Sequence, residues 1–258
     1  MSDTVGNVRR VTHPFLDWPG PLAFAHRGGA SDQPENTLPA FRHAVGLGYT
    51  YLETDVHATT DGVLVAFHDP DLLRTCDRPG RIEELPWREV AAARVGGTVP
   101  IPRMEDLFDE FPTARFNIDC KADSGVVPLV RLLRRRPELL DRVLIGGFSD
   151  ARLRRIRASV DARLCTSFGP QQVAALVTGT RVPWGGQAAQ VPINSRRVRI
   201  VTPRFVERAH ARGIQVHVWT IDDPAEIHRL LDLGVDGIMT DRPAVLRDVM
   251  RERGVWHE

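Results

Sequence analysis

Short apolar runs alternate with segments of helical periodicity along most of the chain. The runs are rich in β-branched and aromatic residues, which predicts strands. The segments between them repeat apolar residues three or four positions apart, which predicts amphipathic helices. Strands that alternate with helices favour a parallel sheet, and eight such units favour a closed (β/α)8 barrel of the α/β class. The predicted strands begin near Leu22, Tyr51, Arg115, Arg142, Arg163, Ala188, Gln215 and Gly237.

Capping residues give the expected ends of several helices. Asn36 is a candidate N-cap for a helix over 37–47, and Asp222 or Asp223 for a helix over 224–233. Glycine commonly ends a helix in a left-handed conformation. Three glycines stand where the predicted helices should stop: Gly48, Gly213 and Gly234.

One segment interrupts the alternation after the second predicted strand. Asp61-Gly62 predicts a turn, 63–67 an extra short strand, and about 69–102, rich in Pro and Gly, an irregular insertion. Such insertions commonly lie above the strand ends where a barrel binds its ligand. We expect this one either to cap a site or to serve as a packing loop. With 1–20 as an N-terminal extension, 1–258 is predicted to form a single barrel domain.

Composition and charge narrow the classes of partner. Hydrophobic residues make up 42% and charged residues 26% of the chain, as in globular proteins. A formal net charge of +1 provides no broad basic field for nucleic acid, so a small-molecule ligand is expected. No apolar run approaches the roughly 18 residues of a membrane span. Nothing in the sequence indicates an oligomeric state.

Cysteine usage and the start of the chain bear on the compartment. The three cysteines are widely spaced and include no C-x-x-C pair, which favours a reducing compartment over a disulfide framework or a zinc site. Arg9 and Arg10 form a twin-arginine pair, but prolines interrupt the stretch that would have to be apolar. The sequence therefore predicts a cytoplasmic protein without a leader.

Residues capable of chemistry gather where the predicted strands end, and this is where barrel active sites lie. The candidates are His26, Arg27, Glu53, Asp55, His68, Asp119, Lys121 and Trp219.

The acidic candidates predict a metal site. Residues two apart on a strand face the same way, so Glu53 and Asp55 project together, as do Asp119 and Lys121. Three carboxylates in one place repel one another, and a hard divalent cation, Mg²⁺ or Ca²⁺, relieves that repulsion. Taken alone, a Glu-x-Asp pair would more often form exposed salt bridges. Its combination with the other strand ends favours metal ligands.

The remaining candidates fit acid/base chemistry on a phosphoryl group. His26 and His68 are suited to proton transfer near neutral pH, and Arg27 and Lys121 to stabilising phosphoryl charge. Lys121 is the only lysine of the chain, and a compact ammonium is not equivalent to a guanidinium at a tight anionic site. Trp219 is expected to line the cavity or to pack within the barrel. Other histidines are expected to be structural, including a buried, hydrogen-bonded His217 on an inward strand position.

With these residues in place, the chain closely resembles the glycerophosphodiester phosphodiesterase family. The resemblance runs from about Phe24 to Pro243, and the order and spacing of its blocks make it specific. The blocks are 25–29 (AHRGG), 34–37 (PENT), 52–56 (LETDV), 60–62 (TDG), 67–69 (FHD), 117–121 (NIDCK), 218–220 (VWT) and 234–241 (GVDGIMTD).

The resemblance implies a (β/α)8 barrel that hydrolyses glycerophosphodiesters to sn-glycerol 3-phosphate and an alcohol with a divalent cation. It implies general acid and base roles for His26 and His68, phosphate contacts for Arg27 and Lys121, and metal ligation for Glu53 and Asp55. Asp119 departs from the family, which usually has glutamate there, so the preferred metal is open. Two alternatives are a related phosphodiesterase of lysophospholipids or phosphosphingolipids that forms a cyclic phosphate, and a non-catalytic glycerophosphate-binding barrel. The second would be expected to lack one of these groups.

Overall fold

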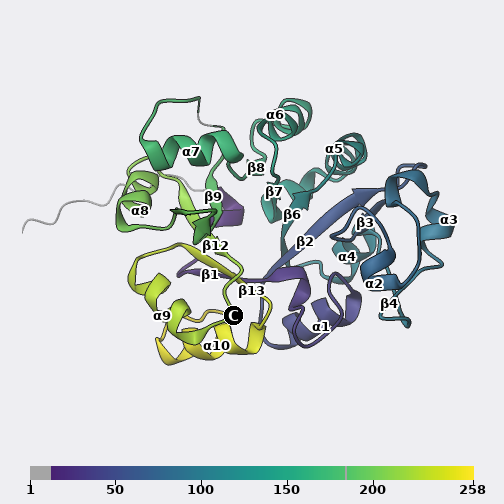
Figure 1. Ribbon diagram of the computed structural model, residues 1–258, viewed down its shortest axis with the longest axis horizontal. Helices are drawn as coiled ribbons and strands as arrows, with labels where there is room; N and C mark the ends of the chain where they lie inside the picture. Colours follow the sequence, from purple (N-terminus) through teal and green to yellow (C-terminus); the bar gives the residue numbers. More distant parts are fainter. Residues whose placement is uncertain (1–12, 184) are drawn as a thin grey trace, which may run out of the picture.

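The computed structural model describes residues 13–183 and 185–258; the first part of the predicted extension, Arg9 and Arg10 included, lies outside them. Its frame is a ring of eight parallel strands. Figure 1 shows the ring from the carboxyl ends of the strands, an opening that is called the mouth below. The strands are β1 (Leu22–Ala25), β2 (Tyr51–Ala58), β6 (Arg115–Cys120), β7 (Val143–Gly146), β8 (Cys165–Thr166), β9 (Ala188–Pro192), β12 (Gln215–Trp219) and β13 (Gly237–Thr240).

Strand pairing makes this sheet a barrel. The hydrogen-bonded order is β8-β7-β6-β2-β1-β13-β12-β9, and a parallel bridge between Ser167 and Ala188 joins its two ends. The predicted (β/α)8 architecture is therefore confirmed, and each predicted strand begins within two residues of the observed one. All eight residues of β2 are buried, as expected for a parallel strand covered on both faces.

Helices surround the ring. Those that follow the barrel strands are α1 (Leu38–Gly46), α4 (Met104–Glu110), α5 (Val126–Arg135), α6 (Asp150–Ser159), α7 (Pro170–Thr178), α8 (Pro203–His210), α9 (Pro224–Asp232) and α10 (Pro243–Glu252), with 3-10 turns η2 (His26–Gly28), η4 (Asp123–Gly125) and η5 (Pro137–Arg142). None of the helices described is long and apolar enough to cross a bilayer.

The capping predictions were partly right. Asp223 caps α9 by accepting the Glu226 backbone N–H at 3.0 Å. Asn36 is not a cap: Thr37 caps α1, because its hydroxyl accepts the backbone N–H of Ala40. The Asn36 side chain instead donates to Asp55 at 3.0 Å, and this contact depends on the folding of the barrel rather than on local sequence.

The insertion after β2 has a small core of its own. β3 (Leu64–Ala66) pairs antiparallel with β2, and α2 (Leu73–Cys76), η3 (Ile82–Glu84), α3 (Trp87–Val90) and the hairpin of β4 (Arg94–Val95) and β5 (Val99–Pro100) follow. Its buried residues are Val65, Phe67, Leu72, Ile82, Val90, Ala93, Val95 and Ile101.

Each barrel strand has one face packed against the helices and one face inside the barrel. Phe116 and Ile118 on β6 point outward into the core shared with the helices. His217 points inward, is fully buried, and lies 3.3 Å from Gln190 and 3.0 Å from Gln215. Burial lowers its pKa to about 4, so the ring is neutral at pH 7. The prediction of a structural, hydrogen-bonded His217 is confirmed.

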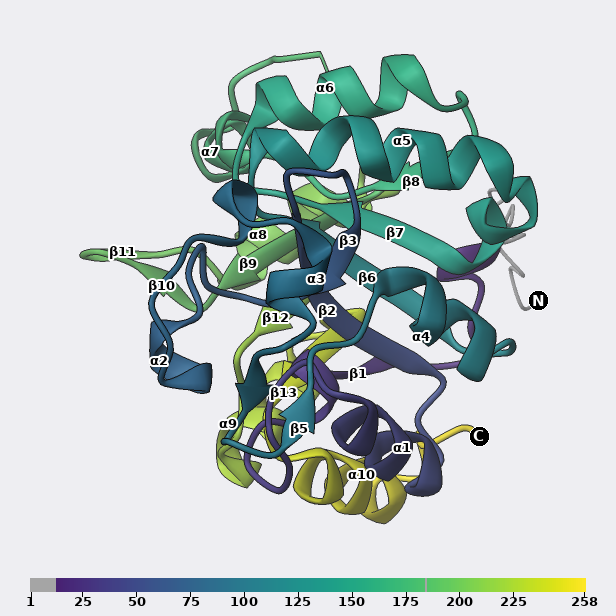
Figure 2. The ribbon, with the colours of Figure 1, turned by 90° about the vertical axis from the view of Figure 1, so that its right-hand side faces the viewer.

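The residues just before β1 close the floor of the barrel. The turn η1 (Pro14–Leu16) places Phe15, which is fully buried, edge-on against Tyr51 with ring centroids 5.3 Å apart. The Tyr51 hydroxyl donates to the Phe15 carbonyl at 2.7 Å, and an Arg115 guanidinium nitrogen donates to the same carbonyl at 3.1 Å. Figure 2 shows this end of the barrel on the right.

Removal of the floor side chain should destabilise the fold. We expect Phe15→Ala to lower the free energy of unfolding by about 3–5 kcal/mol, because it leaves a cavity under the barrel. Phe148→Ala, at a ring that is 63% exposed, is the matched control and should change it by no more than about 0.5 kcal/mol. Urea denaturation followed by circular dichroism measures both, and similar midpoints for the two variants would contradict the packing described here.

Candidate active site

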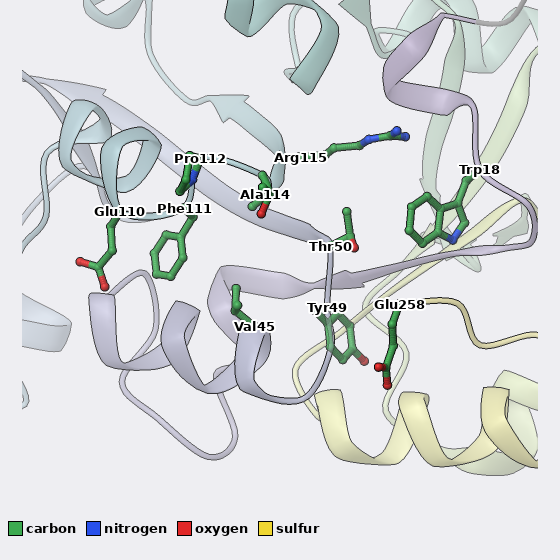
Figure 3. Close-up of a pocket in the computed structure, with 11 residues that line it drawn as sticks. Trp18, Val45, Tyr49, Thr50, Glu110, Phe111, Pro112, Ala114, Arg115 and Glu258 are labelled. Atoms are coloured by element: carbon green, nitrogen blue, oxygen red, sulfur yellow. The ribbon is translucent and has the colours of Figure 1, made fainter.

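The two ends of the barrel differ in chemistry. A cavity of about 420 Å³ lies at the amino-terminal ends of the strands (Figure 3), where Arg115 is its single lining cation. That guanidinium is already bound by two backbone carbonyls and the Tyr51 hydroxyl. None of the predicted site residues lines this cavity. They lie at the carboxyl ends of the strands, around the mouth.

Strand register brings the three candidate carboxylates together. Asp55 on β2 is directly opposite Asp119 on β6, and Glu53 is one inward position below Asp55. Lys121, just after β6, lies between the two aspartates: its Nζ is 2.8 Å from Asp55 Oδ1 and 2.6 Å from Asp119 Oδ2. The mouth therefore holds an ammonium clamped by two buried carboxylates.

The turn after β1 places a second cation in this cluster. Arg27 Nε lies 3.2 Å from Asp55 Oδ2, an ion pair without hydrogen-bond geometry, and the Arg27 backbone N–H donates to Glu53 Oε2 at 3.0 Å. Arg27 has a left-handed φ of 52°, which is costly for a residue with a side chain and typical of functional turns.

The two glycines after Arg27 are explained by the local structure. Gly28 and Gly29 have φ values of 83° and 94°, a region that glycine adopts without strain. A Cβ on Gly28 would lie 2.7 Å from Ala40 Cβ, and one on Gly29 would lie 2.6 Å from Pro243 Cγ. Close approach to α1 and α10 is sufficient to explain both glycines.

Burial and mutual repulsion set the protonation of the carboxylates. Burial, reinforced by the charge of Asp55, raises the pKa of Glu53 to about 7. Burial also raises the pKa of Asp119, and there it outweighs the adjacent Lys121. For Asp55 the balance is reversed, because Lys121 and Arg27 overcome burial and lower its pKa. Asp55 is thus the firmly ionised member of the three.

Each candidate histidine has a carboxylate on its Nδ1. His26 Nδ1 lies 2.7 Å from Asp241 Oδ1, and His68 Nδ1 lies 2.6 Å from Asp69 Oδ1. A carboxylate at Nδ1 fixes the ring and leaves Nε2 for a ligand. Burial opposes protonation of His26, but Glu53 and Asp241 outweigh it and raise its pKa. Asp241 and Asp69 lie within the motifs quoted above, yet their pairing with the histidines follows only from the fold.

Arg74 joins the insertion to the mouth. From α2 it donates to Glu35 at 2.7 and 2.9 Å and also forms an ion pair with Asp69, the partner of His68. Glu35 in turn accepts from Arg27 at 3.1 Å. The insertion therefore contacts the groups that orient His68 and Arg27, which favours the expectation of a functional segment over that of a packing loop.

An aromatic pair lies beside Lys121. Trp219, at the end of β12, packs edge-on against Phe148 with centroids 5.8 Å apart, and Lys121 Nζ lies 5.7 Å from the centre of the Phe148 ring. Sequence reasoning missed Phe148, because a single aromatic residue in a loop has no periodic signal. Trp219 is at the carboxyl end of its strand, and it is partly buried against the residues that fill the inside of the barrel.

The donor set is compatible with a divalent cation. Among the described residues no group of three or more His, Cys, Asp or Glu is already arranged around a metal position. However, Asp119 Oδ1 is buried without a hydrogen-bond partner, and the three carboxylates share the two cations Arg27 and Lys121. Oxygen ligands of this kind suit Mg²⁺ or Ca²⁺.

A (β/α)8 barrel with carboxylates, two cations and two oriented histidines at its mouth is the class of scaffold suited to a phosphorylated ligand. The chain belongs to the glycerophosphoryl diester phosphodiesterase family, whose family model matches residues 26–245. The resemblance deduced from the motifs is confirmed.

Individual relatives cover nearly the whole chain. A Mycobacterium tuberculosis protein named "Probable glycerophosphodiester phosphodiesterase 2" is 41% identical over 94% of this chain and 95% of its own. The mouse protein "Lysophospholipase D GDPD1" is 28% identical over 88% of this chain and 85% of its own. A crystal structure from Silicibacter pomeroyi, described by the same family name, has a TM-score of 0.80 and 25% identity. The match covers 94% of this chain and 98% of the Silicibacter chain. An Oleispira antarctica phosphodiesterase, solved with the product sn-glycerol-3-phosphate, shares the fold at a TM-score of 0.75 and 21% identity, with 90% and 97% covered.

The carboxylate at Nδ1 should control the protonation of His26. We expect Asp241→Asn to lower the pKa of His26, because it replaces a charged acceptor that favours the imidazolium by a neutral one. Asp236→Asn is the matched control: Asp236 lies 2.8 Å from His210, so this change should lower the pKa of His210 and leave that of His26 unaltered. Ring NMR titrations report both. A His26 titration unchanged by Asp241→Asn would refute the pairing.

Proposed function

We propose that this protein hydrolyses glycerophosphodiesters to sn-glycerol 3-phosphate and an alcohol, in a reaction that depends on a divalent cation. The observation that carries the proposal is the meeting of two carboxylate-bound histidines with Arg27 and Lys121 at one barrel mouth. Membership of the glycerophosphoryl diester phosphodiesterase family supports the same reaction. The three cysteines are free, which suits the cytoplasm as its compartment.

The phosphate would bind against the cations of the mouth. Arg27 presents a guanidinium suited to two phosphate oxygens, and Lys121 a compact ammonium. Each is now held by Asp55, so the diester and the carboxylates would share these cations. A divalent cation held by Glu53, Asp55 and Asp119 would polarise a phosphate oxygen and offset the charge of the carboxylates.

The histidines would move the protons of the reaction. His26, whose pKa is raised by Glu53 and Asp241, would donate a proton to the departing alcohol oxygen. His68, oriented by Asp69, would accept the proton of the attacking hydroxyl. That hydroxyl could be the neighbouring one on the glycerol, giving a cyclic phosphate that water then opens. Phosphorus NMR during turnover would detect the ring.

A second substrate class has support from one observation. Lysophospholipids carry an acyl chain that needs an apolar surface near the mouth, and Leu73 and Phe148 expose such surface there. Other large apolar side chains of the insertion are less exposed: Leu72 is buried, and Leu85 and Trp87 are partly buried against the insertion core. The mouse relative is named a lysophospholipase D.

Metal dependence is tested by removal and restoration. We expect EDTA-treated protein to release no glycerol 3-phosphate from glycerophosphocholine, and Mg²⁺, Ca²⁺ or Mn²⁺, supplied separately, to restore release, because the mouth has uncompensated carboxylates. An enzymatic glycerol 3-phosphate assay measures it. Full activity in EDTA would contradict the metal site. No release with any metal, but hydrolysis of lysophosphatidylcholine, would favour the second substrate class.

The two histidine roles predict different responses to the leaving group. We expect His26→Ala and His68→Ala each to reduce turnover of glycerophosphocholine by roughly 10²–10⁴-fold. With glycerol 3-(p-nitrophenyl phosphate), whose leaving group needs no proton, His26→Ala should lose much less while His68→Ala should lose as much as before. His228→Ala, at a partly exposed histidine outside the mouth, is the control. Equal losses for both mouth variants on both substrates would contradict the assignment of separate roles. A smaller loss for His68→Ala than for His26→Ala on the nitrophenyl substrate would reverse it.

A further inference from the structure

The basic residues are distributed unevenly along the chain. Residues 162–206 contain six arginines and no aspartate or glutamate, although the whole chain has a formal charge of only +1. The rest of the chain is therefore net acidic. This basic segment covers β8, α7, β9 and the hairpin that follows β9.

The hairpin places three of these arginines far from the barrel. β10 (Asn194–Ser195) and β11 (Val198–Arg199) pair antiparallel, with Arg196 and Arg197 as the two-residue turn. All residues from 194 to 199 are exposed. Figure 2 shows the hairpin projecting to the left, the side opposite the C-terminus. It follows the carboxyl end of β9, so it stands on the mouth side of the barrel.

The turn of the hairpin keeps its charges free. Arg196 has a left-handed φ of 52°, where glycine or asparagine would be less strained. Within residues 13–183 and 185–258, neither Arg196 nor Arg197 forms an ion pair. Arg199 lies near Glu226, but that carboxylate is already bound by Arg229. The tip therefore has cations without an internal partner.

Exposed apolar side chains share the same side. Among the described residues, three of the five large hydrophobic side chains that are exposed lie on segments that follow the carboxyl end of a barrel strand: Val127 after β6, Phe148 after β7 and Val198 after β9. A fourth, Leu73, precedes Arg74 in α2, and Arg74 contacts Glu35 and Asp69 at the mouth. Val198 stands between two arginines. A surface that combines unpaired arginines with apolar side chains matches an anionic phospholipid interface, which offers both negative charge and hydrocarbon.

We propose that the mouth face is a docking surface for an anionic phospholipid membrane, with the hairpin of residues 194–199 as its first contact. The arginines attract the negative surface, and Val198, Phe148 and Leu73 enter the interface. Docking in this orientation turns the mouth toward the lipid. The attachment is peripheral and depends on the hairpin rather than on the chemistry of the mouth.

Vesicle sedimentation tests the docking directly. The full-length protein is mixed with vesicles of phosphatidylcholine, alone or with about one quarter phosphatidylglycerol, at low and at raised salt. We expect binding to the mixed vesicles only, weakened by salt. Arg196→Asn with Arg197→Gln removes two charges and keeps a residue suited to the left-handed turn, and should weaken binding roughly thirtyfold. Val198→Ser should weaken it several-fold.

A matched control removes the same charge elsewhere. Arg131→Gln with Arg134→Gln, on the exposed side of α5, should leave vesicle binding unchanged. Hydrolysis of soluble glycerophosphocholine should be the same in both double variants, so a failure of docking and a failure of the proposed reaction give different results. The proposal is overturned if the protein does not sediment with anionic vesicles, or if the two double variants weaken vesicle binding equally. A dimer in solution that only the hairpin variant disrupts would assign the face to a second copy.

Discussion

Three carboxylates are buried at the barrel mouth, and the positive charges of Lys121 and Arg27 offset the cost of burying them. The rest of the structure depends on this balance of charge. Removing a carboxylate from water without a partner is very costly, and breaking one buried pair typically costs about 3–5 kcal/mol. Lys121 bridges Asp55 and Asp119, while Glu53 accepts the backbone N–H of Arg27 and lies 3.8 Å from His26 Nε2. Three carboxylates share these two cations, and Asp119 Oδ1 is buried without a hydrogen-bond partner. The excess of carboxylate oxygens supports the proposal that the mouth binds a divalent cation.

A second layer of ion pairs orients the groups that face the ligand. Asp241 and Asp69 each hold one histidine through Nδ1, and Arg74 ties Asp69 to Glu35. Such outer partners fix the direction of a ring and tune its basicity. Because Arg74 comes from the insertion, the position of that segment and the orientation of His68 are coupled. This coupling, rather than a lid, is the contribution of the insertion that the structure shows.

Periodicity and motif spacing were sufficient for the barrel and for the gathering of polar residues at its mouth, because both follow from local alternation along each strand. They could not supply pairings between distant segments. His26 and Asp241 are separated by 215 positions, and the real partner of Asn36 is Asp55 rather than a helix end. Phe148 and the hairpin tip were missed for a related reason: their meaning depends on which side of the barrel they occupy. The distances between the carboxylate oxygens proposed to bind a metal likewise depend on tertiary packing.

The most direct test of this account is the turnover of glycerophosphocholine by Lys121→Arg, with thermal unfolding as the check on folding. The charge is retained, but a planar guanidinium cannot occupy the position of an ammonium 2.6 and 2.8 Å from two carboxylates. We predict a folded protein whose turnover is reduced on the order of 10²–10³-fold, the loss typical of one removed charge-stabilising donor. Turnover close to that of the unaltered protein would show that the clamp between Asp55 and Asp119 does not govern the reaction.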